Sequence, residues 1–182
     1  MFDPFRKPPA VLATPSLVLC DPKFPHNVGA TVRAASCFGV GEVWITGTRL
    51  AVDVRAAARI PREERMRDYR EVALILHARP LELAPAGAVP VAVELLPGAE
   101  NLTTFEHPGD AVYVFGPEDG SIPGPLRGRC HRRVFIPTRH CVNLAAAVYL
   151  VLYDRALKRV QAGEEPALPI SEVLGKTRAS GG

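Results

Sequence analysis

Short apolar runs alternate with longer segments of helical periodicity along the 182 residues of the chain. Each run is four or five residues long and is closed by turn-forming residues, as Asp21 and Pro22 close the first one. Runs of this length with such borders predict buried β-strands. We expect these strands at residues 16–20, 42–46, 91–95, 111–115 and 133–136.

Two segments have the spacing of amphipathic helices. From Val28 to Phe38, apolar residues recur at intervals of three and four, and Gly39 follows as a helix stop. Asn27 precedes this segment and is predicted to be its N-cap. A second, longer helix is expected over residues 143–160. Its apolar face carries Leu144, Val148, Val151 and Leu152.

Strands that alternate with helices predict an α/β fold with a mainly parallel sheet flanked by helices. We place a single domain at residues 1–165, and we expect the Pro-, Ser- and Gly-rich residues 166–182 to form a flexible tail. The apolar stretch at 144–152 is too short to cross a bilayer, and the N-terminus lacks the apolar segment of a signal peptide. We therefore expect a cytoplasmic protein with no membrane partner.

The net charge of +3 is too small to indicate a nucleic-acid partner by itself, but the arginines are clustered. The first cluster is interleaved with acidic residues, so a solvated helix face explains it as well as an RNA-binding surface does. The second cluster contains no acid, which favours an RNA-facing surface with Arg129 and Arg132 as contacts. The first comprises Arg55, Arg59, Arg62, Arg65, Arg67 and Arg70, and the second Arg127, Arg129, His131, Arg132 and Arg133.

The four cysteines form no Cys-x-x-Cys pair. Adjacent pairs such as Cys130-His131 and His140-Cys141 match no usual zinc-ligand spacing, because neighbouring residues rarely point at one ion. We therefore expect no metal site, and we interpret the cysteines as free thiols.

Ligands of parallel α/β sheets usually bind in the loops that follow the strands. Three such loops carry polar or glycine residues. The first leads through Asn27 toward Arg33, the second is Phe115-Gly116-Pro117-Glu118, and the third runs from Ile136 to Leu144. Taken singly each has a simpler explanation, since Asn27 would serve as a cap, Gly116 as a turn residue and Glu118 as a turn carboxylate. The residues alone predict only a ligand site at the strand ends.

In this order, however, the motifs resemble the SpoU (TrmH-type) branch of the SPOUT methyltransferases. The resemblance rests on Asn27-Val28-Gly29-Ala30-Thr31-Val32-Arg33-Ala34-Ala35 with Phe38-Gly39-Val40, on Val114-Phe115-Gly116-Pro117-Glu118, and on Ile136-Pro137 with Asn143-Leu144. It covers residues 16–153, which is nearly the whole predicted domain.

The resemblance implies an α/β domain whose C-terminal part is a trefoil knot that binds S-adenosylmethionine. Members of the family are usually homodimers, and the apolar helix at 144–152 is a candidate for that contact, although core packing explains its pattern equally well. The cofactor would bind among three loops. The implied contacts are Val93, Glu94, Phe115, Gly116, Ile136, Thr138, Cys141 and Leu144.

The resemblance also implies transfer of a methyl group to an RNA ribose 2′-hydroxyl, with tRNA favoured. Arg33 would bind RNA and assist the reaction, either by holding a phosphate or by stabilising the developing alkoxide. Asn27 would position Arg33 or the ribose, Glu118 would fix the second motif by pairing with Arg33, and Asn143 would anchor the third loop. These four residues are the predicted catalytic set.

One position departs from the family pattern, because Cys141 stands where a serine is usual, and a thiol is a weak hydrogen-bond partner. Three alternatives stay open at this point. The substrate could be ribosomal RNA or a small molecule, or the chain could be a non-catalytic RNA-binding module of the same fold.

Overall fold

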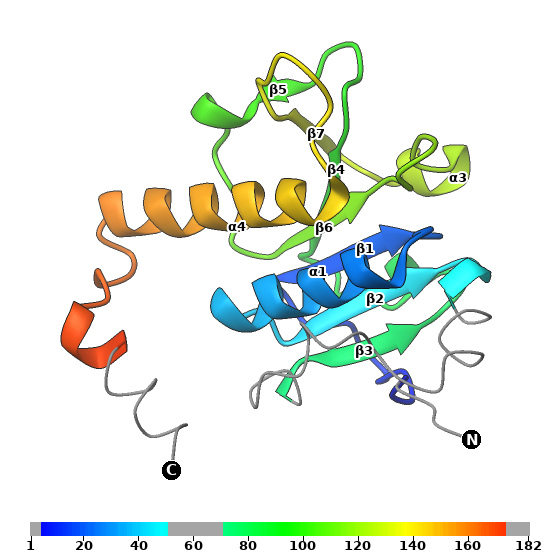
Figure 1. Cartoon of the computed structure of the whole chain (residues 1–182), viewed down its shortest axis with the longest axis horizontal. Coiled ribbons are helices and arrows are strands. Elements are labelled where there is room, and N and C mark those ends of the chain that lie inside the picture. The colour runs from blue at the N-terminus through cyan, green and yellow to red at the C-terminus, as the bar shows by residue number, and fades with distance from the viewer. Residues whose placement is uncertain (1–4, 51–70, 174–182) are drawn as a thin grey trace.

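The computed structural model describes residues 5–50 and 71–173. Within them, seven strands form one sheet in the order β3-β2-β1-β6-β4-β7-β5, and each strand pair is parallel (Figure 1). The strands are β1 (Ser16–Cys20), β2 (Glu42–Thr46), β3 (Ala73–Leu76), β4 (Val89–Val93), β5 (Glu100–Asn101), β6 (Ala111–Phe115) and β7 (Arg132–Phe135). The predicted mainly parallel α/β sheet is therefore confirmed.

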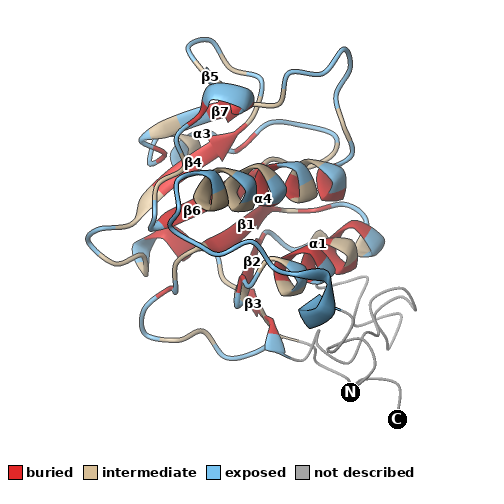
Figure 2. Ribbon diagram, turned by 90° about the vertical axis from the view of Figure 1, so that its left-hand side faces the viewer, coloured by how far each residue is buried: buried red, intermediate tan, exposed pale blue. Residues whose placement is uncertain are grey.

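Two long helices cover one face of this sheet. They are α1 (Pro25–Cys37) and α4 (Leu144–Gln161), which lie side by side in both views (Figures 1 and 2). The shorter elements are α3 (Gly124–Arg127) and the 3₁₀ turns η3 (Pro80–Glu82) and η4 (Leu102–Thr104). Because α1 follows β1 and α4 follows β7, both helices begin at the edge of the sheet where the parallel strands end.

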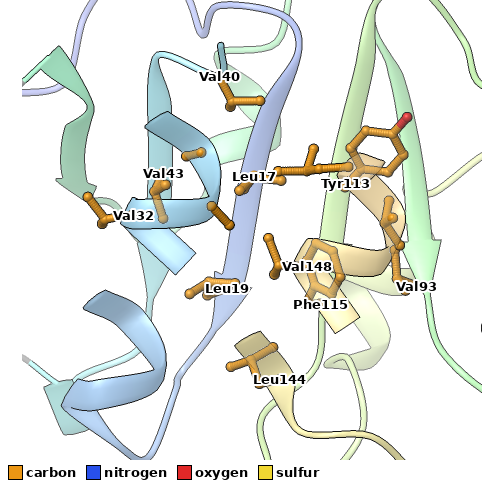
Figure 3. Packing of buried hydrophobic residues seen from close by; sticks show 14 of the residues in the cluster. Leu17, Leu19, Val32, Val40, Val43, Val93, Tyr113, Phe115, Leu144 and Val148 are labelled. Carbon is orange, nitrogen blue, oxygen red and sulfur yellow. The ribbon is translucent and has the colours of Figure 1, made fainter. Parts of the chain in front are cut away.

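The core has two layers because successive side chains of a strand point to opposite faces. Leu17 and Leu19 of β1 face α1 and α4, and Figure 3 shows Val148 of α4 beside Phe115 of β6 in the same layer. On the other face, Val18 packs with the residues that cover the back of the sheet. These include Leu12, Leu81, Ile122 and Leu126, and Trp44 of β2 lies in the same layer. Covering on both faces explains why the central strands are apolar throughout.

Three of the five predicted strands, 16–20, 42–46 and 111–115, have the predicted bounds. The strand expected at 91–95 lies at Val89–Val93, because β4 pairs with β6 over these five residues. Pro90 is tolerated near the start of the strand, before the pairing with β7 begins at Val91. The strand expected at 133–136 lies one residue earlier. The trefoil knot and the domain bounds stay predictions, and the arginine cluster at 55–70 lies outside the described residues.

The prediction that Asn27 caps the first helix is wrong. The helix begins three residues earlier than predicted, with Phe24 as N-cap and Pro25 in its first turn, where proline's fixed φ and missing N–H are tolerated. Asn27 is consequently inside the helix and buried, with its side chain available for other contacts. The predicted stop is confirmed, since α1 ends at Cys37 and Gly39 has a φ of 70°.

No helix in the described part of the chain is long and apolar enough to span a bilayer.

Candidate active site

A pocket of about 320 Å³ opens where β4 and β6 end and where the loop before α4 returns to the sheet. All eight residues predicted to bind a cofactor line it. The complete lining is Val93, Glu94, Leu95, Phe115, Gly116, Pro117, Glu118, Gly120, Ser121, Ile136, Thr138, Cys141, Val142, Leu144 and Ala147. Three separate loops of the sequence therefore form one cavity.

Six lining residues are absent from the predicted site, namely Leu95, Pro117, Gly120, Ser121, Val142 and Ala147. Ala147 could have been found from the sequence, whereas Ser121 could not. Ala147 follows Leu144 by three residues on a helix, so the two share a face, and helical spacing alone would have included it. Ser121 comes from the irregular loop after β6, for which no periodic signal exists.

Gly116 is required by the close approach of two backbone segments. A Cβ at this position would lie 3.1 Å from the backbone nitrogen of Ile122, closer than nine in ten real contacts of a Cβ atom. The loop after β6 therefore folds back tightly over Gly116 and forms one wall of the pocket. A side chain at position 116 would displace that wall or fill the space beside it.

A chain of side-chain hydrogen bonds joins the three motifs. The Asn27 Nδ2 donates to Glu118 Oε1 at 2.6 Å, and Asn143 Nδ2 donates to Asn27 Oδ1 at 2.9 Å. We call Asn27, Glu118 and Asn143 the three-residue bridge. Asn143 also caps α4, because its Oδ1 accepts hydrogen bonds from the N–H groups of Ala145 and Ala146. The bridge thus ties α1, the loop after β6 and the start of α4 together beside the pocket.

Glu118 also holds the turn that precedes α1. Its Oε2 accepts a hydrogen bond from the Lys23 N–H at 2.8 Å, and its Oε1 lies 3.4 Å from the Phe24 nitrogen. Burial alone would raise the pKa of the Glu118 carboxyl, but the hydrogen bonds from Lys23 and Asn27 outweigh burial and lower that pKa. The carboxylate stays charged and sits at the positive end of α1. The predicted Glu118–Arg33 pair is therefore wrong, because backbone N–H groups and Asn27 occupy the carboxylate instead.

Arg33 lies outside the pocket lining. Its side chain projects from α1 as an exposed residue, and it forms no hydrogen bond or ion pair within the described part of the chain. Its charge acts on Tyr149 of α4, whose pKa is raised by burial and lowered in part by Arg33. The site therefore offers a cation on α1 with no acidic partner among residues 5–50 and 71–173, which is what a phosphate-binding arginine needs.

The two other predicted RNA contacts are engaged within the chain. Arg132 pairs with Glu100 at 2.5 Å, and its guanidinium lies 4.3 Å from the centre of the Phe105 ring. Arg129 is half exposed and donates to the carbonyl oxygen of Leu81. Their role in RNA binding stays a prediction, and the internal contacts make Arg132 the weaker candidate.

No group of three or more His, Cys, Asp or Glu side chains in residues 5–50 and 71–173 is arranged to hold a metal ion. All four cysteines are free, with Cys20 and Cys130 buried and Cys37 and Cys141 exposed. Burial raises the pKa of the Cys130 thiol to about 11, so that thiol stays protonated.

The family model described as SpoU rRNA Methylase matches residues 15–153 of the chain. No curated protein matches the chain. Among solved structures, the A. aeolicus TrmH/SpoU tRNA modifying enzyme is similar over 90% of this chain and 85% of its own, with a TM-score of 0.68 and 20% identity.

Two further structures share the fold. One, described as "Structural insights into the 2-OH methylation of C/U34 on tRNA", is 25% identical over 81% of this chain and 96% of its own, with a TM-score of 0.60. The other is the SpoU methyltransferase AviRb from Streptomyces viridochromogenes in complex with AdoMet, 17% identical over 80% of this chain, with a TM-score of 0.59. The chain spans only 60% of AviRb and 55% of an rRNA methyltransferase from Sinorhizobium meliloti.

Proposed function

The chain belongs to the SpoU rRNA methylase family, and from that membership we propose that it transfers the methyl group of S-adenosylmethionine to a ribose 2′-hydroxyl of RNA. The observation that carries the proposal is the convergence of the three motif loops on one pocket. Residues that are far apart in the sequence line this pocket, and the three-residue bridge joins its wall to the helix that carries Arg33.

The residues of the pocket fit S-adenosylmethionine. Phe115, Ile136 and Leu144 provide apolar surface for a nucleoside, and the tight loop over Gly116 leaves room for close backbone contact. Glu94 supplies a buried carboxylate oxygen that lacks a partner among the described residues. When bound, S-adenosylmethionine supplies a methyl group that is already activated by the neighbouring sulfonium charge. Two of the similar structures, AviRb and a Sinorhizobium meliloti enzyme, were crystallised with AdoMet.

Arg33 would act on the RNA. Using it as a base would mean neutralising a guanidinium at pH 7, which costs about 9 kcal/mol from its reference pKa. Its charge is exposed and has no partner in the described part of the chain, which suits a backbone phosphate, or negative charge that develops on the 2′-oxygen. The predicted positioning role of Asn27 is then indirect: the bridge holds α1, and α1 holds Arg33.

We further propose tRNA as the substrate class. This rests on the similar structure that concerns 2-OH methylation of C/U34 on tRNA, of which the chain spans 96%, and on the A. aeolicus tRNA modifying enzyme. An RNA-modifying role also agrees with the predicted cytoplasmic location.

We propose that the protein is a homodimer. Helix α4 carries Leu150, Tyr153 and Leu157, which are 40%, 60% and 41% exposed and share one face at helical spacing. The opposite face of α4 packs into the core through Val148 and Leu152. An exposed apolar stripe on a helix that is already packed on its other side is typical of an interface. Tyr153→Glu should convert the dimer to a monomer in size-exclusion chromatography with light scattering.

Transfer of radiolabelled methyl groups from S-adenosylmethionine to total tRNA tests the function. We expect incorporation with the wild-type protein and a loss of at least about a hundredfold with Arg33→Ala, in the range of a lost charge-stabilising contact. Cofactor affinity, measured by calorimetry, should stay nearly unchanged in this variant because Arg33 is outside the pocket.

Arg79→Ala is the matched control, since Arg79 is 74% exposed and does not line the pocket. It should transfer methyl groups at the wild-type rate. Wild-type turnover by Arg33→Ala would refute the role given to Arg33. If S-adenosylmethionine binds but tRNA is not labelled, the tRNA proposal fails, and the same assay with ribosomal RNA then separates an rRNA methyltransferase from a chain that does not methylate RNA.

A further inference from the structure

Glu94 follows β4 and places a carboxylate in the wall of the pocket with one oxygen engaged and the other without a partner. Its Oε1 accepts a hydrogen bond from the Ile122 N–H at 3.3 Å. Its Oε2 is buried and has no hydrogen-bond partner among residues 5–50 and 71–173. Buried carboxylate oxygens without partners are costly and rare in native proteins, so this atom calls for a donor that the described chain does not provide.

The charges of the lining indicate where that donor comes from. Glu94 and Glu118 are the charged residues that line the pocket, and no lysine, arginine or histidine of the described segments accompanies them. The oxygens of Glu118 are already held by Asn27 and the backbone N–H groups of the turn before α1. Glu94 Oε2 is therefore the open acceptor in a pocket whose lining carries no positive charge, and the donor has to arrive with the ligand.

We propose that Glu94 is the residue by which this chain recognises a hydrogen-bond donor on S-adenosylmethionine, an inference that rests on the proposed function. The cofactor offers donors of two origins, the α-ammonium of its amino-acid part and the N–H or O–H groups of its nucleoside. A carboxylate gains most from a charged donor, and it also binds ribose hydroxyls well. Because Oε1 holds Ile122, a donor at Oε2 would also stabilise the loop that covers Gly116.

Calorimetric titration with three ligands tests the proposal. S-adenosylmethionine and S-adenosylhomocysteine carry both kinds of donor, whereas 5′-methylthioadenosine carries the nucleoside but no amino-acid part. The variant is Glu94→Gln, which keeps an oxygen for the Ile122 N–H and removes the charge and the second acceptor. Glu106→Gln, the same change at an exposed position that does not line the pocket, is the control.

We expect Glu94→Gln to bind S-adenosylmethionine about tenfold to a hundredfold more weakly, the range for a hydrogen bond to a charged group, and Glu106→Gln to bind as the wild type does. If only the two ligands with an amino-acid part weaken, the partner of Glu94 is the α-ammonium. If 5′-methylthioadenosine weakens equally, the partner belongs to the nucleoside. Both results support the proposal.

Unchanged affinity of Glu94→Gln for all three ligands would overturn it and would leave Glu94 as a support for the Ile122 loop alone. Should this variant fail to fold, Glu94→Asp, which keeps the charge but withdraws it by one methylene, must weaken the same ligands. A wild-type protein that binds none of the three ligands would instead contradict the proposed function, so the two failures are distinguishable.

Discussion

The three-residue bridge predicts a large loss of stability from one buried amide. Asn27→Ala removes the 2.6 Å hydrogen bond to the Glu118 carboxylate and the 2.9 Å hydrogen bond from Asn143. A hydrogen bond to a charged group is worth about 1.5–3 kcal/mol and a neutral one about 1 kcal/mol. Because Asn27 is only 2% exposed, water replaces these contacts poorly, and we expect the free energy of unfolding to fall by about 2–4 kcal/mol.

Urea denaturation measures this loss as a lower midpoint at an unchanged m-value. Asn101→Ala is the matched control, because the Asn101 side chain also takes part in two hydrogen bonds, both as acceptor, but is less buried than Asn27 and is the N-cap of η4. It should cost about 1 kcal/mol or less. Asn27→Ala should also weaken S-adenosylmethionine binding, since the bridge holds the loop after β6 and the start of α4, which both line the pocket.

A double-mutant cycle with Glu118→Ala decides whether the bridge acts as a unit. We expect a coupling energy of at least about 1 kcal/mol between positions 27 and 118, since the two groups are in direct contact. The reasoning fails if the two single losses add to the double loss within about 0.5 kcal/mol, or if Asn27→Ala costs no more than the Asn101 control.

Three other predictions follow from named contacts. Gly116→Ala should cost about 1–3 kcal/mol of stability and weaken cofactor binding, because its Cβ would crowd the Ile122 nitrogen at 3.1 Å. A cofactor affinity equal to that of the wild type, measured by calorimetry, would exclude this crowding. Burial lowers the pKa of His107 from 6.5 despite its hydrogen bond with Asp154, so the folded protein binds a proton at His107 less readily than the unfolded chain does. The stability of the protein should therefore fall as the pH drops through 6.5. Thermal denaturation should show a less steep fall for His107→Gln than for the wild type. The pKa of Glu118 is lowered from 4.5, so its contribution to stability is present above pH 4.5 and is lost in more acidic solution. The stability of Glu118→Gln should therefore decrease less steeply with acidification than that of the wild type, and equal slopes of stability against pH would contradict this.

The sequence predicts the central strands well because these strands are buried on both faces. A run such as 111–115 consists of apolar and aromatic residues, and its bounds follow from Asp110 before it and from Gly116 and Pro117 after it. Strand β3 escaped detection because its short apolar run has no turn-forming residue immediately before it and cannot be told from part of a helix by periodicity, and β5 has only two residues. The cap was misplaced because Asn27 has the right residue type, whereas Pro25 in the first turn decides where the helix begins.

The site is a different case, since its parts are distant in the sequence. Asn27 and Asn143 are 116 residues apart, and no periodicity indicates that their side chains meet. The family motifs predicted eight cofactor contacts as a set, and all eight residues line one pocket. The motifs did not reveal that Glu118 holds Asn27 rather than Arg33, because pairing depends on the path of the turn before α1.

The central claim is that this pocket serves methyl transfer to an RNA ribose. The most direct test is mass spectrometry of nucleosides from tRNA that was incubated with the protein and S-adenosylmethionine carrying a deuterated methyl group. We predict one labelled nucleoside whose added mass resides on the ribose, and no such product with Arg33→Ala. Label on a base, or no label in RNA under conditions where calorimetry shows the cofactor bound, would contradict the claim.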